Sequence, residues 1–174
     1  MAFKRSPVRS RFAPLIRTRL PLAFAALAVA SACSRPSFDD AAEAQVLLKR
    51  DREWAALAAA GKDPDAVAAF WTADALVYPP GRPILEGRAA IRAYVAESFK
   101  IQGFRIHWVS EKPSFAADGK MAYMRSTNEI TVPDSQGTPM TISARGVTVW
   151  RLEPDGHWWC AVDIWNDGPK LKKG

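Results

Sequence analysis

The spacing of hydrophobic and polar residues predicts helices in the first half of this chain. Residues 39–60 repeat at helical spacing, and Gly61 supplies a C-terminal stop. The apolar stripe of this helix comprises Ala44, Val46, Leu47, Trp54, Leu57 and Ala58. Asp63 and Pro64 begin a second, shorter helix that runs to about Trp71, because Asp caps a helix and Pro is tolerated in its first turn.

Strand spacing dominates the second half of the chain. The predicted strands cover 75–78, 84–85, 104–114, 121–132 and the two arms of a hairpin over 141–167. A third helix is predicted over 88–100. Three helices followed by a run of long strands predict an α+β fold, in which a curved antiparallel sheet packs on the N-terminal helices.

The last strand carries an acidic residue among large apolar side chains. Alternation places Asp163 on one face with Ala161 and Trp165. A carboxylate in such surroundings is either paired or functional. Pairing with Arg145 or Arg125, or with the backbone N–H groups of a loop, remains open beside a functional role.

The first 32 residues have the composition of an export signal. A basic segment ends at Arg19, and an apolar run follows to Ala32 that is too short for a permanent membrane span. The sequence Ala-Ser-Ala-Cys resembles a bacterial lipobox. That resemblance implies a lipid on Cys33, a membrane tether and an envelope location, with a freely soluble exported form as the alternative.

The rest of the chain is predicted to form three segments. Residues 33–38 are predicted to be a tether, 39–168 one folded domain, and 169–174 a polar tail.

The net positive charge of the chain lies in its first part. Six of the 24 basic residues lie in the first 32 residues, where there is no acidic residue. From Cys33 onward 18 basic residues balance 18 acidic ones. The domain therefore lacks the basic footprint of nucleic-acid binding, and we expect no nucleic-acid partner.

The histidines and cysteines are not spaced as metal ligands. His107 and His157 are the only histidines, and Cys33 and Cys160 the only cysteines. We therefore expect no metal site and no cofactor. Cys160 is predicted to be a small buried residue, although a disulfide with Cys33 is an alternative that lipidation would exclude.

Several short motifs resemble those of the nuclear transport factor 2-like superfamily. They are, in order, Asp51-x-x-Trp54, Phe70-x-x-Ala73-Asp74-Ala75, Gly87-x-x-Ala90-Ile91, Trp150…Gly156-x-Trp158 and Asp163-Ile164-Trp165-Asn166. The chain is most similar to the SnoaL-like and ketosteroid isomerase-like branch, including domain of unknown function 4440. The resemblance spans about 39–167. It implies a cone-shaped curved sheet wrapped around helices, a pocket at the open end, and a homodimer through the sheet face.

The resemblance does not extend to steroid isomerisation. Ketosteroid isomerase needs a carboxylate base, a Tyr and a carboxylic acid that stays protonated. At the corresponding positions this chain has Pro79 for the base, Glu53 or Trp54 for the Tyr, and Thr148 for the acid. We therefore do not expect that activity.

The resemblance and the strand alternation together name the candidate site. Asp163 is predicted to be catalytic, and Tyr78 to offer a hydroxyl to a ligand. The predicted pocket residues are Trp54, Tyr123, Arg125, Thr127, Glu129, Thr148 and Trp165. The alternative for the strand over 121–132 is that this face is solvated and that Met124, Ile130 and Val132 supply the core.

These observations predict an exported protein that binds a small, partly apolar molecule. If it is an enzyme, we expect cofactor-free acid-base chemistry of the isomerase, dehydratase or cyclase kind, with Asp163 moving a proton while Tyr78, Tyr123 or Arg125 polarises a carbonyl oxygen. The alternative from another class is a non-catalytic interaction module of the cell envelope, with an exposed apolar patch on its sheet.

Overall fold

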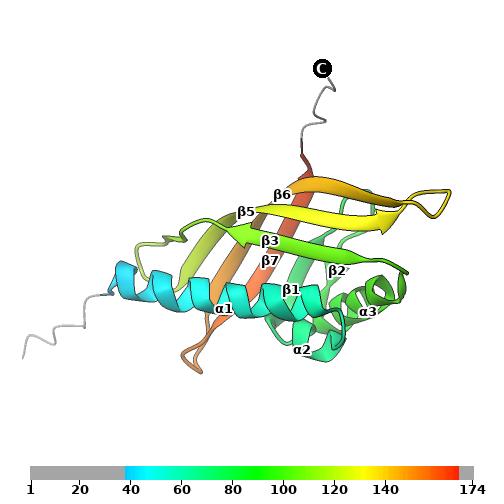
Figure 1. Cartoon of the computed structure of the whole chain (residues 1–174). Helices are drawn as coiled ribbons and strands as arrows, with labels where there is room; N and C mark the ends of the chain where they lie inside the picture. The colour runs from blue at the N-terminus through cyan, green and yellow to red at the C-terminus, as the bar shows by residue number, and fades with distance from the viewer. Residues whose placement is uncertain (1–37, 169–174) are drawn as a thin grey trace, which may run out of the picture. The chain divides into compact units, whose positions relative to one another are not determined.

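The computed structural model describes residues 38–168. The predicted export signal, Cys33 and the polar tail lie outside these residues. Within them, three helices precede most of a seven-stranded sheet that is curved and unclosed (Figure 1). The predicted α+β fold is confirmed.

The first helix, α1 (Asp40–Ala60), has well-defined ends. The Asp39 carboxylate accepts hydrogen bonds from two backbone N–H groups of the first turn, both at 3.0 Å. Gly61 ends the helix with a φ of 61°, a left-handed conformation that favours glycine. The buried stripe is narrower than predicted, because Val46 and Leu57 are 53% and 37% exposed.

The second helix is shorter than predicted. It spans α2 (Pro64–Ala68), and the Asp63 carboxylate caps it by accepting from Ala66 N–H at 2.9 Å. Trp71, expected near its end, instead begins the first strand. The third helix, α3 (Gly87–Lys100), is as predicted to within a residue. In the part of the chain that the structure describes, no helix is long and apolar enough to cross a membrane.

The sheet is antiparallel except at one pair of strands. Its strands are β1 (Trp71–Tyr78), β2 (Leu85–Glu86), β3 (Arg105–Ser110), β4 (Ser114–Phe115), β5 (Met121–Pro133), β6 (Pro139–Leu152) and β7 (Trp158–Asp167). They lie in the order β2, β1, β7, β6, β5, β3, with β4 also paired to β5. The parallel pair is β1 with β7. The strand predicted over 104–114 is therefore two strands, β3 and β4, on the same partner.

A β-bulge in β7 decides which side chains face the helices. Trp150 pairs with Cys160, but the preceding residue of β6, Val149, pairs with Val162, so Ala161 is an extra residue. An extra residue shifts the alternation of a strand by one position. Cys160 and Asp163 therefore both face inward, although strict alternation would put them on opposite faces.

The core lies between the helices and the inner face of the sheet. Its largest fully buried side chains include Trp150, Trp158 and Met124 from the sheet and Leu47 from α1. Burying each such side chain stabilises the fold by roughly 1.5–3 kcal/mol. Cys160 is also 0% exposed, as the sequence predicted. This part of the interior is filled, and the space for a ligand lies further along the sheet.

Candidate functional site

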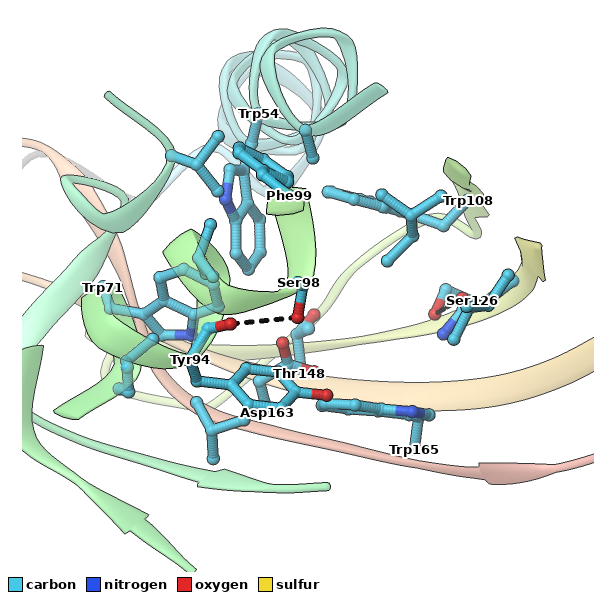
Figure 2. Close-up of a pocket in the computed structure, with 18 of the residues that line it drawn as sticks. Trp54, Trp71, Tyr94, Ser98, Phe99, Trp108, Ser126, Thr148, Asp163 and Trp165 are labelled. Carbon is cyan, nitrogen blue, oxygen red and sulfur yellow. Dashed lines mark hydrogen bonds between the residues drawn. The ribbon is translucent and has the colours of Figure 1, made fainter. Parts of the chain in front are cut away.

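A cavity of about 160 Å³ lies between α3 and the inner face of the sheet. Aromatic side chains supply much of its wall: Trp54, Trp71, Tyr94, Phe99, Phe104, Trp108 and Trp165. Figure 2 shows Trp54 and Phe99 on one side of the cavity and Trp165 on the other. A cavity of this size suits a molecule with one ring, because an engineered apolar cavity of about 150 Å³ binds benzene.

Trp54 is the centre of the aromatic wall. Its ring makes edge-to-face contacts with Trp71 at 4.6 Å, Trp108 at 5.2 Å and Trp150 at 5.6 Å between centroids. It also stacks on Phe70 at 5.8 Å. Each such pair adds about 0.5–1.5 kcal/mol beyond burial, so these rings hold one another in place.

Two indole N–H groups of this wall have no partner within residues 38–168. They are Trp54 Nε1 and Trp71 Nε1, and their side chains are 2% and 5% exposed. An unpaired buried donor costs about 1–3 kcal/mol. Both nitrogen atoms have less than 1 Å² of accessible surface, so protein atoms cover them and they do not open onto the cavity.

The polar groups of the cavity are mostly bonded to one another or to the backbone. Ser126 Oγ donates to Asn128 Oδ1 at 2.7 Å, and Ser98 Oγ donates to a backbone carbonyl at 2.9 Å. Thr148 Oγ1 accepts from Trp150 Nε1 at 2.8 Å, which leaves its own hydroxyl hydrogen free to donate.

Asp163 is the exception among these polar groups. It is half-buried in the cavity wall beside its β6 neighbour Thr148. Burial, and after it the negative charge of Asp51, raises the pKa of Asp163 to about 7, and no cation or hydrogen bond within residues 38–168 lowers it. Its carboxyl group can therefore hold or release a proton near neutral pH, as acid-base catalysis requires.

Four of the predicted site residues line the cavity. These are Trp54, Thr148, Asp163 and Trp165. The charged partners that would have made Asp163 a structural ion pair lie elsewhere. Arg125 is paired with Glu111, and Arg145 is exposed. The roles of these four residues stay predictions, although their positions suit the predicted pocket.

The predicted face of β5 was wrong. Tyr123, Arg125, Thr127 and Glu129 are all exposed, and none of them lines the cavity. Their β5 neighbours face inward instead: Ala122 and Met124 in the filled core, then Ser126, Asn128 and Ile130 at the cavity. The physical reason is burial. The inward set is small or apolar at its buried end, whereas the predicted set carries two charges that solvent stabilises better.

Tyr78 is also not among the residues of the cavity wall. It pairs with Ile164 on the outer face of the sheet, while its neighbour Val77 faces inward and lines the cavity. The hydroxyl of Tyr78 is therefore placed away from the space in which a ligand would bind.

The contribution of α3 to the cavity was not predicted from the sequence. Tyr94 and Ser98 line the cavity with Phe99, and the negative charge of Asp163 is one cause of the raised pKa of Tyr94, after burial. Figure 2 shows the Tyr94 ring on the same side of the cavity as Asp163 and Trp165. Helical spacing offered a signal, because residues 91, 94, 95, 98 and 99 recur on one face.

The arrangement can bind an apolar molecule and exchange a proton with it. No group of three His, Cys, Asp or Glu side chains among residues 38–168 has the spacing of a metal site. What the cavity wall supplies is one acid of raised pKa, several hydroxyl and amide groups, and a set of aromatic rings.

The sequence profile of the SnoaL-like domain family matches residues 52–161. This match covers most of the folded region, and it begins inside α1 and ends two residues before Asp163. No curated protein sequence matches the chain.

Solved structures show the same fold at low sequence identity. A ketosteroid isomerase-like protein from Erwinia carotovora atroseptica is 21% identical, with a TM-score of 0.60 over 72% of this chain and 98% of that one. ActVI-ORFA from Streptomyces coelicolor is 19% identical, with a TM-score of 0.58 over 72% and 97%. An NTF2-like protein with a cystatin-like fold from Novosphingobium aromaticivorans is 18% identical, with a TM-score of 0.55 over 75% and 82%.

Proposed function

Because this chain belongs to the SnoaL-like family, we propose that it binds a small, largely apolar molecule in the cavity and that Asp163 exchanges a proton with an oxygen of that molecule. The predicted nuclear transport factor 2-like fold and SnoaL-like branch are confirmed by the profile and by the solved structures. The assignment to domain of unknown function 4440 stays a prediction. Catalysis would be cofactor-free and of the isomerase, dehydratase or cyclase kind.

The observation that carries this proposal is a half-buried carboxyl group with a pKa of about 7 in an aromatic cavity. A carboxylate kept only for stability would be paired, because an unpaired buried charge is costly. Asp163 instead faces a space that is open to a ligand. Below neutral pH it can donate a hydrogen bond to a carbonyl oxygen, and above it the carboxylate can accept a proton.

The carboxyl group of Asp163 favours a ligand that carries a hydrogen-bond acceptor. A pure hydrocarbon would leave the protonated carboxyl group without a partner for its hydrogen. A carbonyl or ether oxygen could accept that hydrogen bond, because Asp163 lines the cavity. The proposed ligand is therefore an uncharged ring compound that bears at least one such oxygen.

Two ring compounds of the same shape test this proposal. Acetophenone carries a carbonyl oxygen where α-methylstyrene carries a CH₂ group. We expect ¹⁵N-labelled protein at pH 5.5 to show shifts at the indole and backbone signals of cavity residues with both compounds. Acetophenone should gain affinity from Asp163, and this gain should be lost at pH 8.5, where the carboxyl group is ionised.

Variants of β7 supply the control. Asp163→Leu removes the acid from the cavity, and we expect it to lower the acetophenone preference by about fivefold, the worth of one hydrogen bond of roughly 1 kcal/mol. Asp167→Leu changes an exposed residue of the same strand and should leave the preference unchanged. Absence of cavity shifts with either compound, or an equal preference in all three proteins, would contradict the proposal.

A second candidate function is self-association through the outer face of the sheet. Tyr123, Val147 and Ile164 are 49%, 37% and 44% exposed. Val147 pairs with Ile164 on one side and with the exposed Arg125 on the other. An exposed apolar patch on one sheet face is typical of an interface. We propose that a second copy of this chain covers it, which would place the cavities of the two copies on the far sides of the paired sheets.

Analytical ultracentrifugation tests the dimer. Val147→Lys places a charge at the centre of the patch and should shift a dimer to a monomer. Val46→Lys is the matched control, because Val46 is a valine of α1 that is 53% exposed and far in sequence from the patch. A monomeric unmodified protein at micromolar concentration, or equal dissociation by both variants, would contradict this assignment.

We also propose that the chain is exported and tethered to the membrane through a lipid on Cys33. The support is the sequence alone, because residues 1–37 lie outside the described part. Mass analysis of the protein from a bacterial envelope should give a chain that begins at Cys33 with a diacylglyceryl group. A chain of unmodified mass after cleavage would favour the soluble form, and a mass two units lower would favour the disulfide with Cys160.

A further inference from the structure

A second buried carboxyl group lies behind the wall of the cavity. Asp51, in the middle of α1, is 3% exposed and does not itself line the cavity. Trp108 Nε1 donates a hydrogen bond to Asp51 Oδ1 at 3.2 Å, and the Trp108 ring does line the cavity. Asp51 is therefore one side chain away from a bound ligand.

We propose that Asp51 is a positioning residue of this site, which holds Trp108 against the cavity from behind and places a second acidic group in the surroundings of Asp163. This inference rests on the proposed function, since a positioning residue requires a site to serve. It assigns a role to the Asp51-x-x-Trp54 motif, of which Asp51 is the polar member.

The first part of the role follows from contacts. Trp108 lies on β3, the last strand in the order of the sheet, and in the described part of the chain β3 pairs with β5 on one side only. Its ring meets Trp54 edge-to-face, with 5.2 Å between centroids and 75° between planes. The bond from Trp108 to Asp51 ties the edge strand to α1. Without it, the ring that faces the ligand would be held by packing alone.

The second part follows from charge. Asp51 and Asp163 flank the same cavity, because Asp163 lines it and Asp51 is bonded to Trp108, which also lines it. No salt bridge among residues 38–168 reaches either carboxyl group, and the cation that acts on Asp51 is its neighbour in sequence, Arg52. Asp51 is the second cause, after burial, of the raised pKa of Asp163. Burial also raises the pKa of Asp51 itself, and the hydrogen bond from Trp108 and the charge of Arg52 oppose that rise. Two buried acids in mutual reach ionise in competition rather than independently.

Other titratable groups share this interior. The thiol of Cys160 is 0% exposed, and the charges of both Asp163 and Asp51 contribute to its raised pKa after burial. The charge of Asp163 also contributes, after burial, to the raised pKa of Tyr94 on α3. The Arg82 guanidinium lies 5.6 Å from the centroid of the Tyr94 ring. Cys160 and Tyr94 are neutral near pH 7, so Asp51 is the neighbour that can place a negative charge near Asp163.

Carboxyl ¹³C NMR of the ligand-free protein tests the coupling. Asp51→Asn keeps an oxygen that can accept from Trp108 but removes the charge. We expect the titration midpoint of Asp163 to fall by about half a pH unit or more. Glu53→Gln removes a charge from an exposed position of the same helix, and because solvent screens that charge it should leave the midpoint unchanged.

Trp108→Phe tests the contact separately. It keeps a ring in the cavity wall but removes the donor, so we expect the Trp54 indole signal to shift and the affinity for acetophenone to fall about threefold or more, a loss of roughly 0.7 kcal/mol. The charge of Asp51 remains in this variant, so Asp163 should still titrate above the ordinary range.

The outcomes separate this inference from the proposed function. An Asp163 midpoint that is equal in Asp51→Asn and Glu53→Gln would overturn it, as would an unchanged Trp54 signal in Trp108→Phe. If Asp51→Asn fails to fold, Asp51→Ser, which also removes the charge, takes its place, and the same comparison with Glu53→Gln decides. A shifted midpoint together with no binding of acetophenone would leave the coupling intact and refute the proposed function alone.

Discussion

The two faces of the sheet place acidic groups in opposite surroundings. On the inner face, no cation among residues 38–168 acts on Asp163, and burial raises its pKa to about 7. On the outer face, two hydrogen bonds from Arg151 lower the pKa of Asp74 to about 2. The same side chain thus has a pKa near neutrality on one face and stays ionised on the other. The surroundings, rather than the residue type, decide whether an acid is functional.

The largest expected difference between the faces is in packing, on neighbouring residues of β5. Met124 is 0% exposed and Tyr123 is 49% exposed. We expect Met124→Ala to lower the free energy of unfolding by about 2–5 kcal/mol through a cavity in the core. Tyr123→Ala should change it by less than about 0.5 kcal/mol in the monomer. Urea unfolding of both variants checks this, and equal losses would contradict the assigned faces.

The next largest effect concerns the pH dependence of stability. The pKa of Asp163 in the folded state lies above its ordinary value, so its contribution is fully present below about pH 4 and is lost as the pH rises through about 7. The Asn side chain of Asp163→Asn stays uncharged at every pH, so this variant does not lose stability in that way. We expect the variant to be more stable than the unmodified protein at pH 8, by a few kcal/mol at most, at about 1.36 kcal/mol for each pKa unit.

Thermal unfolding between pH 4 and 8 measures this difference. Asp167→Asn, an exposed change on the same strand, serves as the control and should leave the pH profile unchanged. An Asp163→Asn variant that is strongly destabilised at pH 8 would instead assign the carboxylate to an unrecognised structural bond.

A smaller effect is expected where β6 passes beneath the cavity. A Cβ on Gly146 would lie 2.8 Å from Ser126 Oγ and 3.1 Å from Asn128 Nδ2. These side chains line the cavity, so Gly146→Ala should push them into it. We expect a loss of about 1–3 kcal/mol in stability and weaker binding of acetophenone. Unchanged binding with unchanged stability would show that both side chains can move aside freely.

The smallest effect is expected on the outer face. Arg151→Ala removes the partner of Asp74, whose side chain is 67% exposed. The pKa of Asp74 should return toward its ordinary value, and the stability that the pair adds above about pH 4, which is lost as the pH falls toward 2, should disappear. The change should not exceed about 1 kcal/mol and should shrink in high salt. A larger loss would mean that this exposed ion pair stabilises the fold more than a surface pair should.

Much of the fold could be predicted because local chemistry and tertiary packing agree. Asp39 and Asp63 act as helix caps, and Gly61 ends a helix, just as their side chains suggest. The second helix ended early because Trp71 is bulky and buried, and it pairs with Cys160 across the sheet. That parallel pairing joins segments far apart in the chain, and no local sequence pattern predicts it.

The candidate site could be predicted only in part. On β7, the family motif placed Asp163 inward, whereas alternation counted from the buried Trp158 would have placed it outward because of the extra residue at Ala161. On β5, the residues alternate clearly but the pattern does not say which set meets the helices. The burial of Met124 shows which face of β5 meets the helices. The face that carries Met124 and Ile130 was therefore the better choice for the inner face.

The aromatic wall gives the protein an optical property of its own. Four of the seven tryptophans, Trp54, Trp71, Trp108 and Trp165, surround the cavity. Their emission depends on the polarity of their surroundings, and neighbouring indoles exchange excitation energy. Any compound that enters should therefore alter the colour or brightness of the unlabelled chain. A screen of metabolite fractions could follow that emission directly and without a dye, even while the identity of the bound compound is still open.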